Sequence, residues 1–196
     1  DPPRHLEADL PGDLVGMDCF HVGSFKETRL GQDKSRRGQI WQYTAIDVAS
    51  SFLWAEIHVT PRNPSATHTS ALAQTVARDL AGWGWQWEAA TTDNGNEFRG
   101  ATFGETIARL GARHTRIHAG RPQTNGHVEA LHRIILDECW RPAFARYLYP
   151  RYTGLRRELD TYLHTYNFDR VHHGRLTQGQ IPADIVYGAR KMEATR

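Results

Sequence analysis

Hydrophobic residues recur along the chain with two spacings, which predict a group of strands followed by alternating helices and strands. Apolar and β-branched residues dominate 14–22, 39–48 and 52–59, and we expect a strand in each range. Only residues 49–51 separate the last two, a spacing typical of an antiparallel hairpin. The first part of the chain therefore predicts three antiparallel strands.

The spacing then alternates between helical and strand periods. A helix over 64–80 has Leu72, Val76 and Leu80 on one face, and Gly82 and Gly84 lead from it to a fourth strand that ends at Asp93. The remaining predicted elements are a short helix at 103–110, a strand at 113–118, a helix with apolar positions Val128, Leu131, Ile135 and Cys139, a helical or turn-rich connection between Pro142 and Pro150, and a last helix marked by Leu155, Leu159, Leu163 and Tyr166. This order predicts an α/β fold with a mixed five-stranded sheet.

Length and composition suit one domain. A chain of 196 residues with 39% hydrophobic content can bury a full core without disulfides or a structural metal. Cys19 and Cys139 lack paired spacing, which favours free thiols in a reducing compartment. No apolar run approaches the roughly 18 residues of a membrane helix, and the first residues do not form a signal peptide. We therefore expect a soluble cytoplasmic protein.

The formal net charge of +2 conceals an asymmetry between the two parts of the chain. Residues 1–110 contain 10 Lys and Arg against 14 Asp and Glu, whereas residues 111–196 contain 14 against 8. A basic second half suits contact with a polyanion such as a nucleic acid. Solvated helix faces explain the charge alone equally well.

Three acidic residues stand out by their surroundings. Asp18 lies inside an apolar strand, where an unpartnered carboxylate would be costly to bury. Such a residue needs a hydrogen-bonding network, a cation or a solvent-filled cleft, and for a lone aspartate the network is the commoner solution. Asp93 follows a predicted strand, and Glu129 is the only acid in the basic stretch 111–136 and starts a predicted helix.

These three acids predict a shared cation site. If the first and fourth strands are neighbours, Asp18 and Asp93 meet at their C-terminal ends, where sites form in open α/β sheets. Hard oxygen ligands favour Mg²⁺ or Mn²⁺ over Zn²⁺. Two such ions about 3.5–4 Å apart stabilise both the attacking and the leaving oxygen in a displacement at phosphorus. A phosphodiester is the natural substrate of that arrangement.

The sequence around these acids resembles the Asp-Asp-Glu catalytic core shared by retroviral integrases and insertion-sequence transposases. The resemblance rests on Asp18, on Thr92-Asp93-Asn94-Gly95-Asn96-Glu97-Phe98, and on Pro122-Gln123-Thr124-Asn125-Gly126-His127-Val128-Glu129, with 35 residues between the second Asp and the Glu. Tyr166-Asn167-Phe168-Asp169-Arg170, with His172, Leu176 and Pro182-Ala183 after it, resembles the tail motif of the bacterial members.

The resemblance implies a ribonuclease-H-like fold with helices on both faces of the sheet. It implies that Asp18, Asp93 and Glu129 bind two Mg²⁺ or Mn²⁺ ions, that water cuts a DNA strand, and that the freed 3′-hydroxyl attacks target DNA without a covalent protein intermediate. Expected partners are element-end and target DNA and further copies of the chain, as a homodimer or larger homo-oligomer in a bacterial cytoplasm.

The same resemblance suggests a division of the chain. We expect residues 1–13 to be a linker from a missing N-terminal region, because prolines interrupt any period and no initiating Met is present. Residues 14–150 would form the integrase-like catalytic core, and residues 151–196 a C-terminal helix and tail packed on that core.

DNA contacts are assigned to five residues of the basic stretch: Arg121, Gln123, Asn125, His127 and Arg133. Arg133 is also spaced to pair with Glu129 one helical turn away. The family usually has Lys or Arg at the position of His127, Arg at that of Ala130, and Ser-Arg at that of Ser50-Ser51. Two alternatives remain: a hydrolysis-only nuclease of the same fold, and a domesticated, non-catalytic module that binds DNA or forms oligomers.

Other conspicuous residues have simpler interpretations. We expect Asp47 to hydrogen-bond the backbone of its hairpin turn. Glu97 is interpreted as a salt-bridged surface acid, with contact to substrate or metal-bound water as the less favoured alternative.

Aromatic and histidine residues are treated in the same way. Trp83, Trp85 and Trp87 alternate at strand spacing and are expected to pack rather than to stack on bases. His172 and His173 lack nearby partners for a four-ligand zinc site.

Overall fold

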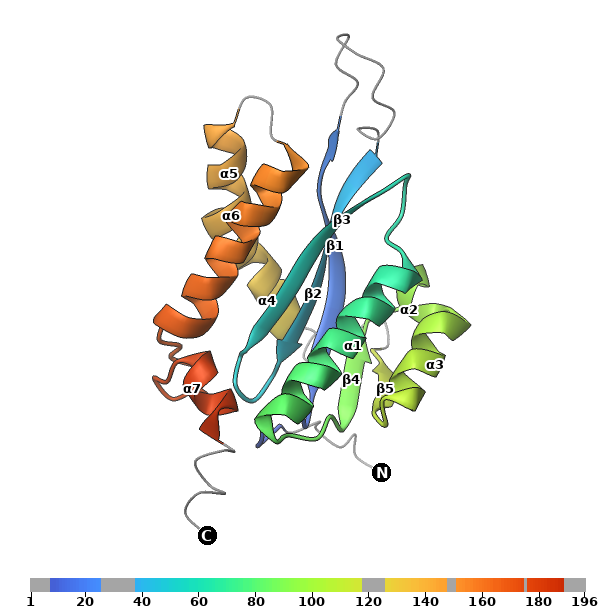
Figure 1. Ribbon diagram of the computed structural model, residues 1–196, viewed down its shortest axis with the longest axis vertical. Coiled ribbons are helices and arrows are strands. Elements are labelled where there is room, and N and C mark those ends of the chain that lie inside the picture. The colour runs from blue at the N-terminus through green and yellow to red at the C-terminus, as the bar shows by residue number, and fades with distance from the viewer. Residues whose placement is uncertain (1–7, 26–37, 118–125, 148–150, 175, 189–196) are drawn as a thin grey trace.

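A five-stranded sheet forms the centre of the fold. We describe residues 8–25, 38–117, 126–147, 151–174 and 176–188 from a computed structural model. The strands run in the order β3-β2-β1-β4-β5 (Figure 1). Their bounds are β1 Val15–Phe25, β2 Gly38–Asp47, β3 Leu53–Thr60, β4 Ala89–Thr92 and β5 Arg113–Arg116.

The sheet is mixed, as predicted from three antiparallel strands followed by strands that alternate with helices. The pairs β1-β2 and β2-β3 are antiparallel, whereas β4 runs parallel to both β1 and β5. The predicted hairpin between β2 and β3 is confirmed. Its turn is held by Asp47, whose carboxylate accepts the backbone N–H of Ser50 at 2.8 Å and the Ser50 hydroxyl at 2.5 Å. The turn role predicted for this acid is confirmed.

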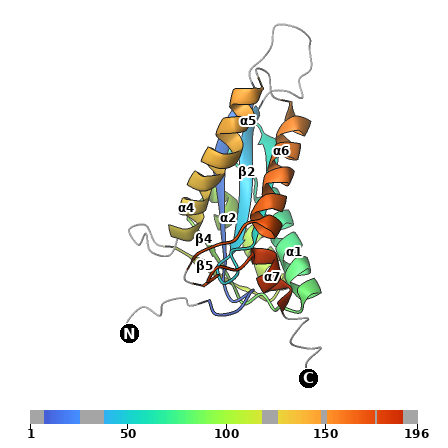
Figure 2. The same ribbon diagram turned by 90° about the vertical axis from the view of Figure 1, so that its left-hand side faces the viewer.

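Helices cover both faces of the sheet. Their bounds are α1 Ala66–Trp83, α2 Asn96–Arg99, α3 Ala101–Arg109, α4 Gly126–Ile135, α5 Arg141–Arg146, α6 Tyr152–His164 and α7 Pro182–Val186, with π-helical turns η3 Leu136–Trp140 and η4 Thr165–Asp169. α1 and α3 lie on one side of the sheet, and α4, α5 and α6 lie on the other (Figures 1 and 2).

Each face of the sheet has its own hydrophobic core, because successive side chains of a strand point to opposite faces. In β1, Val15 and Met17 pack toward α1 and α3, whereas Phe20 and Val22 pack toward α4 and α6. The apolar positions predicted for α4 all contribute to the second core: Val128, Leu131, Ile135 and Cys139.

The C-terminal half departs from the prediction in two places. The helix marked by Leu155 is not the last, because α7 follows it and packs into the core on the α1 side through Ala183 and Val186. α4 also continues through η3 directly into α5, so that the three form one rod in Figure 2. Pro142 does not interrupt this rod, because it lies in the first turn of α5.

The tail motif closes the outer edge of the sheet. Asn167 in η4 is 3% exposed, and its amide pairs with both backbone groups of Leu53 on β3. The Leu53 N–H donates to Asn167 Oδ1 at 2.8 Å, and Asn167 Nδ2 donates to the Leu53 carbonyl at 2.7 Å. The side chain thus replaces a neighbouring strand at an edge that would otherwise present unpaired backbone groups.

The tryptophans pack, as expected, but they do not alternate along a strand. Trp83 ends α1, and the other two lie in the connection to β4. Trp87 is buried, and the Trp85 indole N–H donates to the Val186 carbonyl at 2.6 Å. Gly84 ends α1 with φ 91°, and this left-handed turn breaks the predicted strand spacing.

Both cysteines are free thiols, as predicted, and they lie on different elements, β1 and η3. In the described part of the chain, no helix combines the length and apolar character needed to span a bilayer.

Candidate active site

The register between β1 and β4 makes the backbones at Asp18 and Asp93 adjacent. The two strands are neighbours, and their last aligned pair is Met17 with Thr92. Asp18 and Asp93 are the next residue on each chain. Because neighbouring strands lie about 4.8 Å apart, the two carboxylates start from adjacent backbones.

Asp18 lies inside its strand, as predicted, but the two acids do not lie at the ends of both strands. Asp18 does not end its strand, because β1 continues to Phe25 along β2. It is β4 that stops, at Thr92, and beyond that residue β1 loses its partner on one side. The candidate site therefore lies beside a long strand at the point where its shorter neighbour ends.

α4 docks on β1 next to this position. Gly16 lies two residues before Asp18 and hence on the same face of the strand. A Cβ on Gly16 would lie 2.7 Å from Val128 Cγ2, so the absence of a side chain allows the helix to approach the strand closely. Glu129 follows Val128 in the first turn of α4, where the sequence predicted it. The side chain of Glu129 lies outside the described residues.

The two aspartates are held by short local contacts. Asp18 Oδ1 accepts the backbone N–H of Cys19 at 2.7 Å, and the Asp18 side chain is 15% exposed. Asp93 Oδ1 accepts the backbone N–H of Gly95 at 2.8 Å, which forms a tight turn before α2. Asn94 fixes the same loop by donating to the Ile117 carbonyl at 2.9 Å.

Glu97 is a third carboxylate near this pair, and the interpretation as a surface acid is wrong. It is 9% exposed, and a Cβ on Gly95 would lie 2.7 Å from its carboxylate. Burial raises the pKa of Glu97, and the charge of Asp93 raises it further. Burial also raises the pKa of the Cys19 thiol, and the charges of Glu97, Asp18 and Asp93 raise it further. All three carboxylates therefore act on one sulfur atom.

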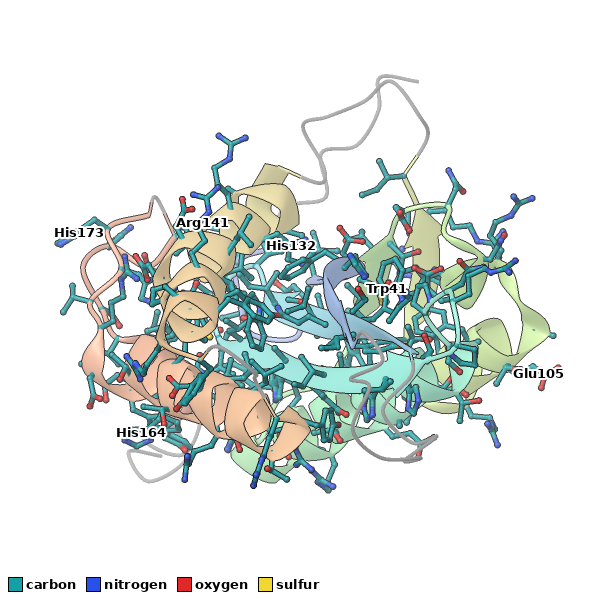
Figure 3. The ribbon with its side chains drawn as sticks, turned by 90° about the horizontal axis from the view of Figure 1, so that it is seen from above. Trp41, Glu105, His132, Arg141, His164 and His173 are labelled. Atoms are coloured by element: carbon teal, nitrogen blue, oxygen red, sulfur yellow. The ribbon has the colours of Figure 1, made fainter. Side chains whose placement is uncertain are left out.

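The structure adds His132, which sequence reasoning missed. It lies on α4, three residues after Glu129, on the inner side of the helix facing the sheet (Figure 3). Its Nδ1 lies 3.6 Å from Asp18 Oδ2, and its Nε2 lies 3.2 Å from Thr44 Oγ1 on β2. Burial lowers the pKa of His132 to about 4. A histidine within the apolar pattern of α4 was the available sequence signal.

Four of the five residues predicted to contact DNA lie wholly or partly outside the described residues. Arg121, Gln123 and Asn125 lie outside the described residues, and so does the side chain of His127. Arg133 is exposed on α4, so it is accessible to a phosphate.

The chemistry of the site suits a hard divalent cation. Asp18 on β1 and Asp93, just after β4, offer carboxylate oxygens, which are the ligands that Mg²⁺ and Mn²⁺ prefer. Among side chains that the structure describes, no three His, Cys, Asp or Glu residues form a metal-binding group. His172 is among these described residues, and its Nε2 lies 3.1 Å from the Tyr166 carbonyl oxygen.

Comparison with known proteins identifies the fold. No family model and no curated protein sequence matches the chain. Its structure matches a chain of the simian T-cell lymphotropic virus intasome in complex with PP2A regulatory subunit B56 gamma, with a TM-score of 0.67, 18% identity, and coverage of 95% of this chain and 60% of that chain.

Two isolated domains match over nearly their whole length. The HTLV-2 integrase catalytic core domain in complex with magnesium, in a dimeric form, has a TM-score of 0.61 and 18% identity, with coverage of 90% of this chain and 97% of that chain. The catalytic core domain of BIV integrase has a TM-score of 0.62 and 19% identity, with coverage of 92% and 97%. The chain thus has the ribonuclease-H-like fold of integrase catalytic cores, as the sequence predicted.

Proposed function

We propose that the chain is the catalytic core of a DNA transposase or integrase, a polynucleotidyl transferase that uses divalent metal ions. The observation that carries this proposal is the β1-β4 register, which makes Asp18 and Asp93 neighbours beside the docked first turn of α4. Glu129, in that turn, would complete the site. The integrase-core fold and the magnesium in the HTLV-2 domain support the proposal.

The reaction would consist of two displacements at phosphorus. In the first, a water molecule loses a proton and its oxygen bonds to phosphorus, while the 3′-oxygen of the cut strand leaves and takes up a proton. In the second, that 3′-hydroxyl loses its proton and its oxygen bonds to a target phosphorus, while the target 3′-oxygen leaves and takes up a proton. Bound Mg²⁺ ions would activate the attacking oxygen and stabilise the leaving one.

The chain's own residues would hold the metal ions and the DNA. Asp18, Asp93 and Glu129 would bind two Mg²⁺ or Mn²⁺ ions. Arg133 is exposed one turn along α4 from Glu129, and it would contact a phosphate together with Arg121, Gln123, Asn125 and His127. Further copies of the chain, as a dimer or larger oligomer, would bring the DNA ends and target together.

A branched DNA substrate tests the transfer step without the native element ends. Each transfer exchanges one phosphodiester for another, so the reaction can run backwards on a preformed joint. The purified chain, with Mn²⁺ or Mg²⁺, should release the branch and reseal the labelled target strand. Asp93→Asn and Glu129→Gln should abolish this product. Glu105→Gln is the matched control, because Glu105 is exposed on α3, far from the site (Figure 3).

The outcomes separate the alternatives. Metal-dependent cutting without resealing would replace this proposal with the hydrolysis-only nuclease. DNA binding with no metal-dependent product would support the non-catalytic module. Resealing that persists in Asp93→Asn would show that the site has been assigned to the wrong residues.

A further inference from the structure

A buried chain of polar side chains runs from the core behind α4 to the candidate site. The Trp140 indole N–H donates to Gln42 Oε1 at 2.7 Å, and Gln42 Nε2 donates to Thr44 Oγ1 at 2.9 Å. Thr44 Oγ1 lies 3.2 Å from His132 Nε2, and His132 Nδ1 lies 3.6 Å from Asp18 Oδ2. Trp140, Gln42 and Thr44 are at most 1% exposed.

The direction of this chain follows first from its inner end. An indole N–H can only donate, so the Gln42 oxygen must face Trp140 and the Gln42 amide NH₂ must face Thr44. Thr44 Oγ1 therefore accepts from Gln42, and its single hydroxyl proton remains to be donated.

The outer end gives the same direction. A carboxylate accepts only, so the nitrogen of His132 that faces Asp18 is stabilised when it carries a proton and repelled when it presents a lone pair. A neutral imidazole carries one N–H, and its other nitrogen accepts. The proton then lies on Nδ1, and Nε2 accepts the hydroxyl proton of Thr44.

We infer that His132 is a positioning residue, which the Trp140-Gln42-Thr44 relay fixes in the Nδ1–H tautomer so that it orients the carboxylate of Asp18. The separation of 3.6 Å is an electrostatic contact rather than a full hydrogen bond. The metal-binding part of this inference rests on the proposed function. The tautomer does not.

The first test therefore needs neither metal nor DNA. In ¹⁵N NMR of the wild-type chain labelled at histidine, His132 should show a protonated signal for Nδ1 and an unprotonated signal for Nε2. His132→Gln identifies the resonance by its loss. A protonated Nε2 would overturn the relay.

The second test compares two amide substitutions at the same position. Asparagine places its amide nitrogen near the position of Nδ1 and keeps a donor toward Asp18, whereas glutamine reaches toward Thr44 instead. Residues that hydrogen-bond a metal ligand typically contribute 10–100-fold to metal affinity. The Mn²⁺ affinity measured by calorimetry should therefore fall about tenfold or more in His132→Gln and by no more than about threefold in His132→Asn. His164→Gln is the control, because His164 is exposed on α6 (Figure 3).

Each outcome bears on the inference. Equal losses in the asparagine and glutamine variants would reduce His132 to a packing residue, and unchanged affinity in His132→Gln would remove its positioning role. A wild-type chain that binds no cation would overturn the proposed function, and the positioning role with it. In that case the NMR tautomer would still report on the relay.

Discussion

Substitution of Gly16 by alanine probes the contact that places α4 against β1. The added Cβ would lie 2.7 Å from Val128 Cγ2, closer than nonbonded carbon atoms approach. Val128 is β-branched and helical, so its χ1 has one strongly preferred rotamer and cannot turn aside. It is also 2% exposed and packed into the core beneath α4. The helix must therefore shift.

The change in the free energy of unfolding caused by Gly16→Ala follows from an overpacking cost and an opposing gain in backbone entropy. Overpacking a core by a methyl group costs typically about 1–3 kcal/mol. Replacing a strand glycine recovers roughly 0.5–1 kcal/mol of backbone entropy. Gly16→Ala should therefore destabilise the fold by about 1–2 kcal/mol. If the helix shifts by about 1 Å, catalysis should fall by roughly 100-fold, because Glu129 moves with it.

Urea denaturation of a double-mutant cycle measures the contact. Val128→Ala alone should cost about 2 kcal/mol through lost burial and a cavity. In Gly16→Ala/Val128→Ala the new methyl occupies the vacated space, so the double variant should be more stable than the sum of the single losses predicts by about 1–2 kcal/mol. Gly23→Ala is the control on the same strand, because its Cβ would lie 3.4 Å from Phe144 Cζ. A neutral Gly16→Ala, or strictly additive losses, would refute the docking argument.

Three further predictions test the candidate site, the sheet edge and the hairpin. Asp93→Asn should leave the stability of the metal-free chain unchanged or slightly higher, because it removes repulsion between carboxylates. The variant should lose most of the rise in melting temperature that Mg²⁺ or Mn²⁺ gives the wild type. A destabilised variant with an unaltered metal response would contradict the site. Asn167→Ala should cost about 1–3 kcal/mol in urea, because two buried backbone groups of Leu53 lose their partner, and a neutral result would show that water replaces it. Burial raises the pKa of Asp47, so the folded chain holds the Asp47 carboxyl proton to higher pH than the unfolded chain does. The free energy of unfolding should therefore fall as the pH rises from the unfolded-state pKa of Asp47 to its folded-state pKa. Asp47→Asn should lack this component, and identical pH dependence in both proteins would count against it.

The sequence predicted the sheet because local patterns determine its strands. Runs rich in apolar and β-branched residues predicted β1, β2 and β3, and a short turn joined the last two. The same patterns predicted that Asp18 and Asp93 lie on neighbouring segments, provided that β1 and β4 pair, as they do. The chemistry of the acids pointed to a cation because buried carboxylates need compensation.

What the sequence could not give depends on contacts between distant segments. Thr44 and His132 are 88 positions apart, and their contact exists only because α4 packs on the sheet at β1, the neighbour of β2. Glu97 looked like a surface acid, yet its helix packs against α1, where the Thr69 hydroxyl donates to the Glu97 carbonyl at 3.2 Å. α7 has only five residues, too few for a helical period to be recognised.

Anomalous diffraction from crystals of the chain grown with Mn²⁺ shows whether Asp18 and Asp93 share a metal ion. We expect a manganese peak between the carboxylates of Asp18 and Asp93, with Glu129 turned toward it from α4. Mn²⁺ bound elsewhere, or Asp18 and Asp93 carboxylates too far apart to share an ion, would contradict it.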